Sequence, residues 1–187
     1  MQDQQTALVV IDAQVGPLFG TYKKDETLNI IQKMIGKAER ENIPIFYIQH
    51  EGESGGLMER GTPFWKFAVG IIPRKADIII HKQFADAFYQ TSLRNDLKRR
   101  SVSTLVVVGV RTEYCVDSTC RSAIALGFDV TLVEVGHTTA DGVISAASII
   151  QHHNRTLSNT FAKERRIAVK MSNDVFSKLA NGNMQEL

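Results

Sequence analysis

The chain has 187 residues, of which 43% are hydrophobic and 22% charged, a composition typical of one globular domain rather than a disordered chain. Its 22 basic and 20 acidic residues leave a net charge of +2 and form no basic stripe, which argues against a nucleic-acid partner. No apolar run approaches the ~18 residues that a membrane span needs, and the opening residues MQDQQTALVV predict no secretory signal. Two cysteines are too few for a disulfide scaffold, so we expect a reducing cytoplasmic setting.

Short β-rich runs alternate along the chain with segments of helical period. The predicted strands are residues 7–11, 44–49, 77–80, 104–108, 128–133 and 166–169, and the predicted helices are residues 27–40, 91–99, 116–126, 142–157 and 173–180. Residues 51–75 are rich in Gly and Pro, which predicts an irregular loop of the kind that forms lids or binding sites.

This alternation predicts the fold class and the domain organisation. Strand and helix in turn favour right-handed crossovers and an α/β fold, a three-layer α/β/α Rossmann-like architecture with a mostly parallel six-stranded sheet and helices on both faces. No repeat or linker divides the chain, so we expect residues 1–187 to form a single domain. Size scaling predicts that about 70% of the unfolded surface is buried, enough for one core.

Ligands of such sheets bind beyond the carboxyl ends of the strands, and several reactive side chains fall there. The predicted strands end next to Asp12, His50, Lys82, Cys115 and His137. A carboxylate, an ammonium, a thiol and imidazoles are therefore expected at one edge of the sheet.

Cys115 has two interpretations. It follows a strand and a short turn and stands at the predicted start of a helix, whose partial positive charge lowers a thiol pKa and stabilises the thiolate. The exposed N–H groups of such a turn can also hold an oxyanion. The alternative is a buried cysteine that only packs in the core.

Asp12 and Lys82 each have a structural alternative as well. Asp12 either caps the turn after the first strand or carries the thiol proton to a leaving amine. Lys82 is either a solvated residue at a strand end or the cation that balances Asp12 and favours the thiolate.

Three segments together resemble the isochorismatase-like cysteine hydrolase superfamily, whose relatives include nicotinamidases and carbamoylamide hydrolases. The segments are ALVVIDAQ at 7–14, HKQFADAFYQTSL at 81–93 and LVVVGVRTEYCVDSTCRSAIALGFDV at 105–130. The resemblance implies a catalytic triad of Asp12, Lys82 and Cys115. It also implies a cis peptide between Val110 and Arg111 that aims the Arg111 N–H, together with the Cys115 N–H, at the oxyanion.

The activity that the resemblance implies is hydrolysis of a C–N bond in a small amide-like substrate. Cys115 attacks the carbonyl, Asp12 carries the proton to the departing nitrogen, and water that Asp12 activates cleaves the thioester. The resemblance suggests a homodimer or larger symmetric assembly, and we expect no nucleic-acid or membrane partner.

The metal site of nicotinamidases, an Asp and two His, has no counterpart here. The corresponding region holds one histidine, His50, beside two glutamates, a poor zinc set, so we expect no metal and no cofactor. The side chains expected to line the substrate pocket are Gln14, Phe19, His50, Trp65, Val110, Tyr114 and His137. Phe64, Trp65 and Phe67 form an aromatic group that roofs the pocket, forms a subunit contact or packs locally.

Three other functions are weighed against amide hydrolysis. Vinyl ether hydrolysis, as in isochorismatase, needs the Asp and the Lys but not the thiol, so Cys115 counts against it. A non-catalytic binding protein on the same fold would not need an intact triad. A nucleotide-binding Rossmann protein would need a G-x-G-x-x-G turn, whereas the turn after Ile11 reads DAQVGP.

Overall fold

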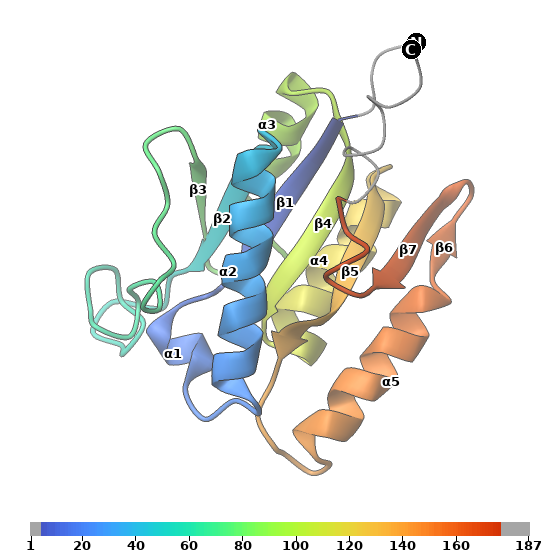
Figure 1. The fold of residues 1–187 in the computed structure, drawn as a ribbon. Helices are drawn as coiled ribbons and strands as arrows, with labels where there is room; N and C mark the ends of the chain where they lie inside the picture. The colour runs from blue at the N-terminus through green and yellow to red at the C-terminus, as the bar shows by residue number, and fades with distance from the viewer. Residues whose placement is uncertain (1–4, 177–187) are drawn as a thin grey trace.

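The computed structural model describes residues 5–176, which build one seven-stranded sheet with the strand order β3-β2-β1-β4-β5-β7-β6 (Figure 1). The strands are β1 (Gln5–Ile11), β2 (Ile45–His50), β3 (Ile78–Lys82), β4 (Val102–Val110), β5 (Asp129–Thr138), β6 (Phe161–Ala162) and β7 (Arg165–Lys170). All neighbouring pairs are parallel except β6 and β7. The α/β class is confirmed, and the one strand beyond the six expected is the two-residue β6, which folds back on β7.

The apolar run of β1 explains its central position. Its last five residues are fully buried and alternate between the two faces of the sheet, as in a strand covered on both sides. Leu8 and Val10 belong to one apolar cluster, whereas Ala7, Val9 and Ile11 belong to another. The sheet therefore separates two cores.

Helices cover both faces of the sheet. α2 (Lys24–Arg40) supplies Ile31, Met34 and Ala38 to one core, and in Figure 1 it lies in front of the central strands. α3 (Leu93–Arg99), α4 (Asp117–Ala125) and α5 (Ala146–Ser158) contribute to the opposite core. This division follows from right-handed crossovers that run in opposite directions from β1. No helix within residues 5–176 is long and apolar enough to cross a membrane.

The helix boundaries differ from the prediction at several points. α2 begins one turn earlier than residue 27, and Asp25 and Glu26 in its first turn interact favourably with the helix dipole. α5 begins at Ala146 instead of residue 142, because the Ser145 side chain accepts the Ser148 N–H and caps the helix there. Of the helix expected at 173–180, residues 173–176 form turns, and residues 177–180 lie outside the described part of the chain.

Two short helices that no periodicity predicts stand beside the carboxyl ends of the strands. α1 (Val15–Leu18) follows β1 directly, and η1 (Thr112–Val116) is a π-helical turn between β4 and α4. The Val110–Arg111 peptide bond that precedes η1 is cis.

The chain turns back across the sheet after β3, so β1 and β4 are the strands at which the strand order reverses. They approach closely there: Gly109 pairs with Ile11 at a φ of 139°, and a Cβ at this position would lie 2.0 Å from Ile11 O. Only glycine fits this contact. The close pairing sets the turn after β4 beside the residue that follows β1, which is Asp12.

Candidate active site

The structure brings Asp12, Lys82 and Cys115 together at the carboxyl ends of β1, β3 and β4. The Lys82 Nζ donates to Asp12 Oδ2 at 2.8 Å and to Cys115 Sγ at 3.3 Å. The Asp12 and Lys82 side chains are 2% and 0% exposed, so neither group is a solvated surface residue. The solvated alternative for Lys82 is therefore wrong, and the carboxylate, ammonium and sulfur form one compact cluster.

Lys82 also organises the surroundings of this cluster. Its Nζ donates to Phe84 O at 3.0 Å and lies 3.3 Å from His50 Nδ1, which is its neighbour across the β2–β3 pair. The ammonium has three protons for these four neighbouring atoms, so the contact with Nδ1 does not by itself fix the tautomer of His50. Burial, reinforced by Lys82, lowers the pKa of His50 below its ordinary 6.5, so the imidazole is neutral at pH 7.

The thiol of Cys115 differs from the expectation of a stabilised thiolate. Burial and the neighbouring Asp12 carboxylate raise the pKa of Cys115 to about 12, and Lys82 only partly opposes them. Cys115 lies inside the π-helical turn, two residues before α4 begins. The prediction that the helix start lowers this pKa is therefore wrong for the free protein, in which the sulfur holds its proton at pH 7.

A cavity of about 400 Å³ opens onto the sulfur. Its walls are formed by Asp12, Pro17, His50, Ala85, Val110, Arg111, Tyr114 and Cys115. Of the seven expected pocket residues, His50, Val110 and Tyr114 are in this wall. Pro17 and Ala85 were missed, although both lie close in sequence to triad residues. Apolar side chains thus surround a few polar groups, as in small-molecule sites.

Gln14 does not line this cavity, contrary to expectation. Its side chain is fully buried, and Nε2 donates to His50 O at 2.9 Å and to Trp65 O, while Oε1 accepts from the His50 N–H at 2.8 Å. The amide therefore ties β2 and the loop after it to the segment that carries Asp12. Its role is to hold the wall rather than to contact a ligand.

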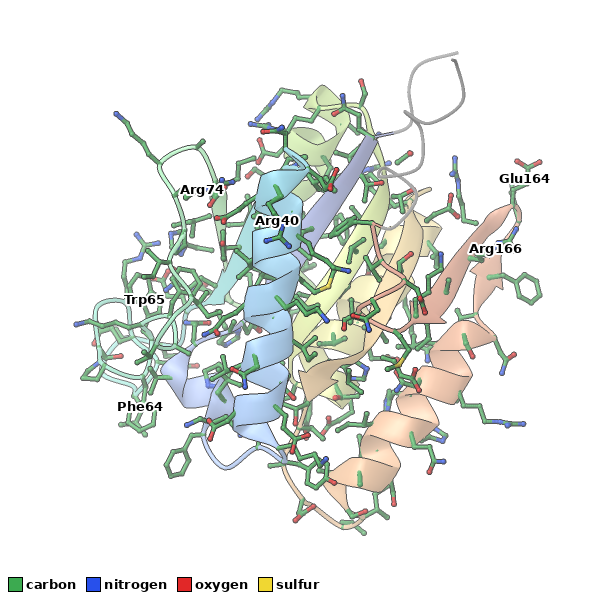
Figure 2. The ribbon with its side chains drawn as sticks, in the orientation of Figure 1. Arg40, Phe64, Trp65, Arg74, Glu164 and Arg166 are labelled. Carbon is green, nitrogen blue, oxygen red and sulfur yellow. The ribbon has the colours of Figure 1, made fainter. Side chains whose placement is uncertain are left out.

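Phe19 and Trp65 also lie away from the cavity wall. The Phe19 ring is 70% exposed and packs edge-on against Phe64, and Trp65 stacks on His81 with ring centroids 6.0 Å apart. Phe64 and Trp65 occupy the loop between β2 and β3 (Figure 2), whereas Phe67 packs on Tyr47. The three loop aromatics make separate local contacts instead of forming one roof.

His137 is the last expected pocket residue that the structure places elsewhere. It is buried, and its two ring nitrogens contact Thr112 Oγ1 and Asn154 Oδ1, both at 2.9 Å. It thus links α5 to the first residue of the turn that carries Cys115. Burial lowers the pKa of His137 to about 4, so the ring is neutral at pH 7.

Histidines and acidic side chains do not gather into a metal site in the described region. Within residues 5–176 no group of three or more His, Cys, Asp or Glu side chains is placed to hold a metal ion. The Nδ1 atom of His50 lies 3.3 Å from the ammonium of Lys82, a cation that does not favour a metal ion at the same place.

Comparison with known proteins places this geometry in a family. The family model of the isochorismatase domain matches residues 6–177. The isochorismatase family protein YecD of Escherichia coli O157:H7 is 33% identical over 166 residues, which cover 80% of this chain and 84% of that protein. The ureidoacrylate amidohydrolase RutB of Agrobacterium fabrum is 32% identical over 98 residues, 51% of this chain and 42% of RutB.

A solved structure agrees with the sequence matches. The crystal structure of an isochorismatase family protein superposes with a TM-score of 0.80 and 32% identity, covering 88% of this chain and 97% of that one. The strand-end cluster and these matches together show that the chain belongs to the isochorismatase family and is a hydrolase of that family.

Proposed function

We propose that this hydrolase cleaves a C–N bond of a small amide through a thioester on Cys115, with Asp12 as the proton carrier. The observation that carries the proposal is the position of the Lys82 ammonium, which touches the Asp12 carboxylate and the Cys115 sulfur at the wall of one cavity. The three groups are thus within the reach that nucleophilic catalysis requires.

The first half-reaction forms the thioester. Because the thiol is protonated at rest, its proton passes to Asp12 as the sulfur bonds to the carbonyl carbon. The C–N bond of the tetrahedral intermediate then breaks, and Asp12 returns the proton to the leaving nitrogen. Lys82 keeps the transient charges on sulfur and carboxylate paired throughout.

The second half-reaction releases the acid. Asp12 takes a proton from a water molecule as the water oxygen attacks the thioester carbon. The C–S bond then breaks, and Asp12 returns the proton to the sulfur. The backbone N–H groups of Arg111 and Cys115, in the turn between β4 and α4, are assigned to the oxyanion in both halves. Loss of one such donor typically costs about 10²–10³ in rate.

Amide cleavage is favoured over the vinyl ether reaction by the thiol itself. A vinyl ether is hydrolysed without a nucleophilic sulfur, yet here the sulfur lies 3.3 Å from the ammonium and opens onto the cavity. The relative RutB is a ureidoacrylate amidohydrolase by name, which supports the same reaction class. A cytoplasmic location and a symmetric homo-oligomer are part of the proposal.

The test is an ammonia-release screen over small amides with matched cysteine variants. We expect Cys115→Ala to lose at least about 10³ in kcat, whereas Cys120→Ala, which removes the buried thiol of the core, keeps the activity. Mass spectrometry of the protein quenched during turnover would show the acyl group on Cys115. Equal activity of Cys115→Ala and the unmodified protein would refute the proposal.

A further inference from the structure

The side chain of Arg111 has no role in the reaction proposed above, yet it belongs to the cavity wall. Its Nε donates to Pro17 O and its Nη2 to Phe19 O, both at 3.2 Å. Pro17 is itself a wall residue, so one of the two backbone carbonyls that hold the guanidinium belongs to the cavity wall, whereas the other, Phe19 O, lies at the exposed rim beside it. Nη1 takes part in neither of these two bonds.

Among residues 5–176 the guanidinium forms no ion pair with an acidic side chain. Its positive charge is thus held beside the cavity wall by neutral carbonyl groups, which orient it without neutralising it. Arginines at fixed positions of this kind are suited to bind carboxylates in a planar, bidentate way.

The charges of the cavity add up to one uncompensated cation. Asp12 and Lys82 pair with each other, His50 is neutral, and the Cys115 thiol keeps its proton. Arg111 therefore leaves the cavity with a net charge of +1. Burial of the other wall groups limits their screening by water, so this charge acts on any group that enters.

We propose that Arg111 is a specificity-determining residue that selects amides carrying an anionic group, of which a carboxylate is the simplest. The proposal rests on the proposed amide hydrolysis and adds the substrate class. The apolar Pro17, Ala85 and Val110 accommodate a short hydrocarbon segment between the amide and the anion. A cavity of about 400 Å³ restricts the whole molecule to a small acid amide.

The electrostatic part can be tested without knowing the substrate, by alkylating Cys115 with two reagents of similar shape. Iodoacetate is an anion and iodoacetamide is neutral, so the ratio of their rates reports the charge that the cavity presents to an incoming group. We expect this ratio to exceed the ratio for free cysteine in the same buffer. Intact-mass spectrometry measures both rates, and the Cys115→Ala variant identifies the labelled thiol.

Arg111→Gln is expected to lower the iodoacetate to iodoacetamide ratio several-fold, because it removes the cation whose Coulomb attraction favours the anionic reagent. Effects of the substitution on the fold or on sulfur reactivity change both rates and cancel in the ratio. Arg111→Lys, which retains the positive charge, is expected to keep most of the iodoacetate to iodoacetamide ratio of the unmodified protein. The matched control Arg94→Gln removes an equal charge from the exposed surface of α3 and should leave the ratio unchanged.

The outcomes separate this inference from the proposed function. A ratio equal to that of free cysteine, or one that Arg111→Gln leaves unchanged while Cys115 is still labelled, would overturn the anion selectivity and leave amide hydrolysis standing. A Cys115 that neither reagent labels would contradict the accessible nucleophile, and the inference would fail together with the proposed function.

Discussion

Replacing Asp12 by Asn is expected to abolish hydrolysis and, at the same time, to speed the alkylation of Cys115 by iodoacetamide. Hydrolysis needs the carboxylate to carry protons, whereas alkylation needs only the thiolate. In the resting protein Asp12 suppresses that thiolate, because burial and its negative charge together raise the pKa of the thiol to about 12. Asn keeps the shape of the side chain and an acceptor for Lys82.

The magnitude follows from the geometry. Asp12 Oδ2 and Cys115 Sγ both contact the Lys82 Nζ, at 2.8 and 3.3 Å, so the two atoms lie within about 6 Å of each other. At an effective dielectric of about 20 the repulsion between a carboxylate and a thiolate at that distance is about 3 kcal/mol. Removing the carboxylate therefore lowers the thiol pKa by about two. The thiolate fraction at pH 8 then rises about 100-fold, while lower basicity reduces nucleophilicity about tenfold. Alkylation should therefore be about ten times faster.

The assay is the alkylation rate at pH 8, followed by intact-mass spectrometry. Asp25→Asn, which removes an exposed carboxylate from the first turn of α2, is the control and should not alter the rate. Slower alkylation of Asp12→Asn would refute the reasoning, since it would mean that the resting sulfur is already a thiolate paired with Lys82 or that Asp12 assists the alkylation itself.

Three further predictions concern stability. Because the pKa of His137 is about 4 in the folded protein against an ordinary 6.5, the unfolded chain binds the proton first, and about 3 kcal/mol of stability present above pH 6.5 is lost as the pH falls from 6.5 toward 4. Urea titrations should show this loss, and His137→Asn should make the free energy of unfolding less dependent on pH in that range. Gln14→Leu removes the amide that bonds the backbone N–H and O of His50, whereas Trp65 O keeps its bond from Gln49 Nε2, and should cost about 2–4 kcal/mol. Gln32→Leu, at an exposed single bond, should cost less than about 0.5 kcal/mol, and equal losses would contradict the bracing role. Gly109→Ala should destabilise the fold by more than about 4 kcal/mol or prevent folding. Gly36→Ala, in the middle of α2 with the nearest atom 3.4 Å from the new Cβ, should stabilise it by about 0.5–1 kcal/mol, and similar thermal midpoints for the two variants would count against the close β1–β4 contact.

The sequence alone predicted the fold class and the members of the reactive cluster. The continuous apolar run of β1 indicates a strand buried on both faces, and the alternation of strands and helices makes the sheet parallel. Once the sheet is parallel, residues that follow strands share one edge, so Asp12, Lys82 and Cys115 are brought together by topology. These inferences depend on hydrophobic period and chain order, which are properties of short segments.

Only the tertiary structure decided what each group does at that edge. The direction of a side chain depends on where its strand really ends and on the turn that follows. Gln14 therefore braces the backbone, and His137, which lies inside β5 rather than beyond it, joins Thr112 to Asn154. The protonation of Cys115 depends on burial and on charges from other strands, which outweigh the local effect of a helix start. The charge of the cavity likewise emerges only when all its walls are assembled, because it is a sum over residues from separate elements.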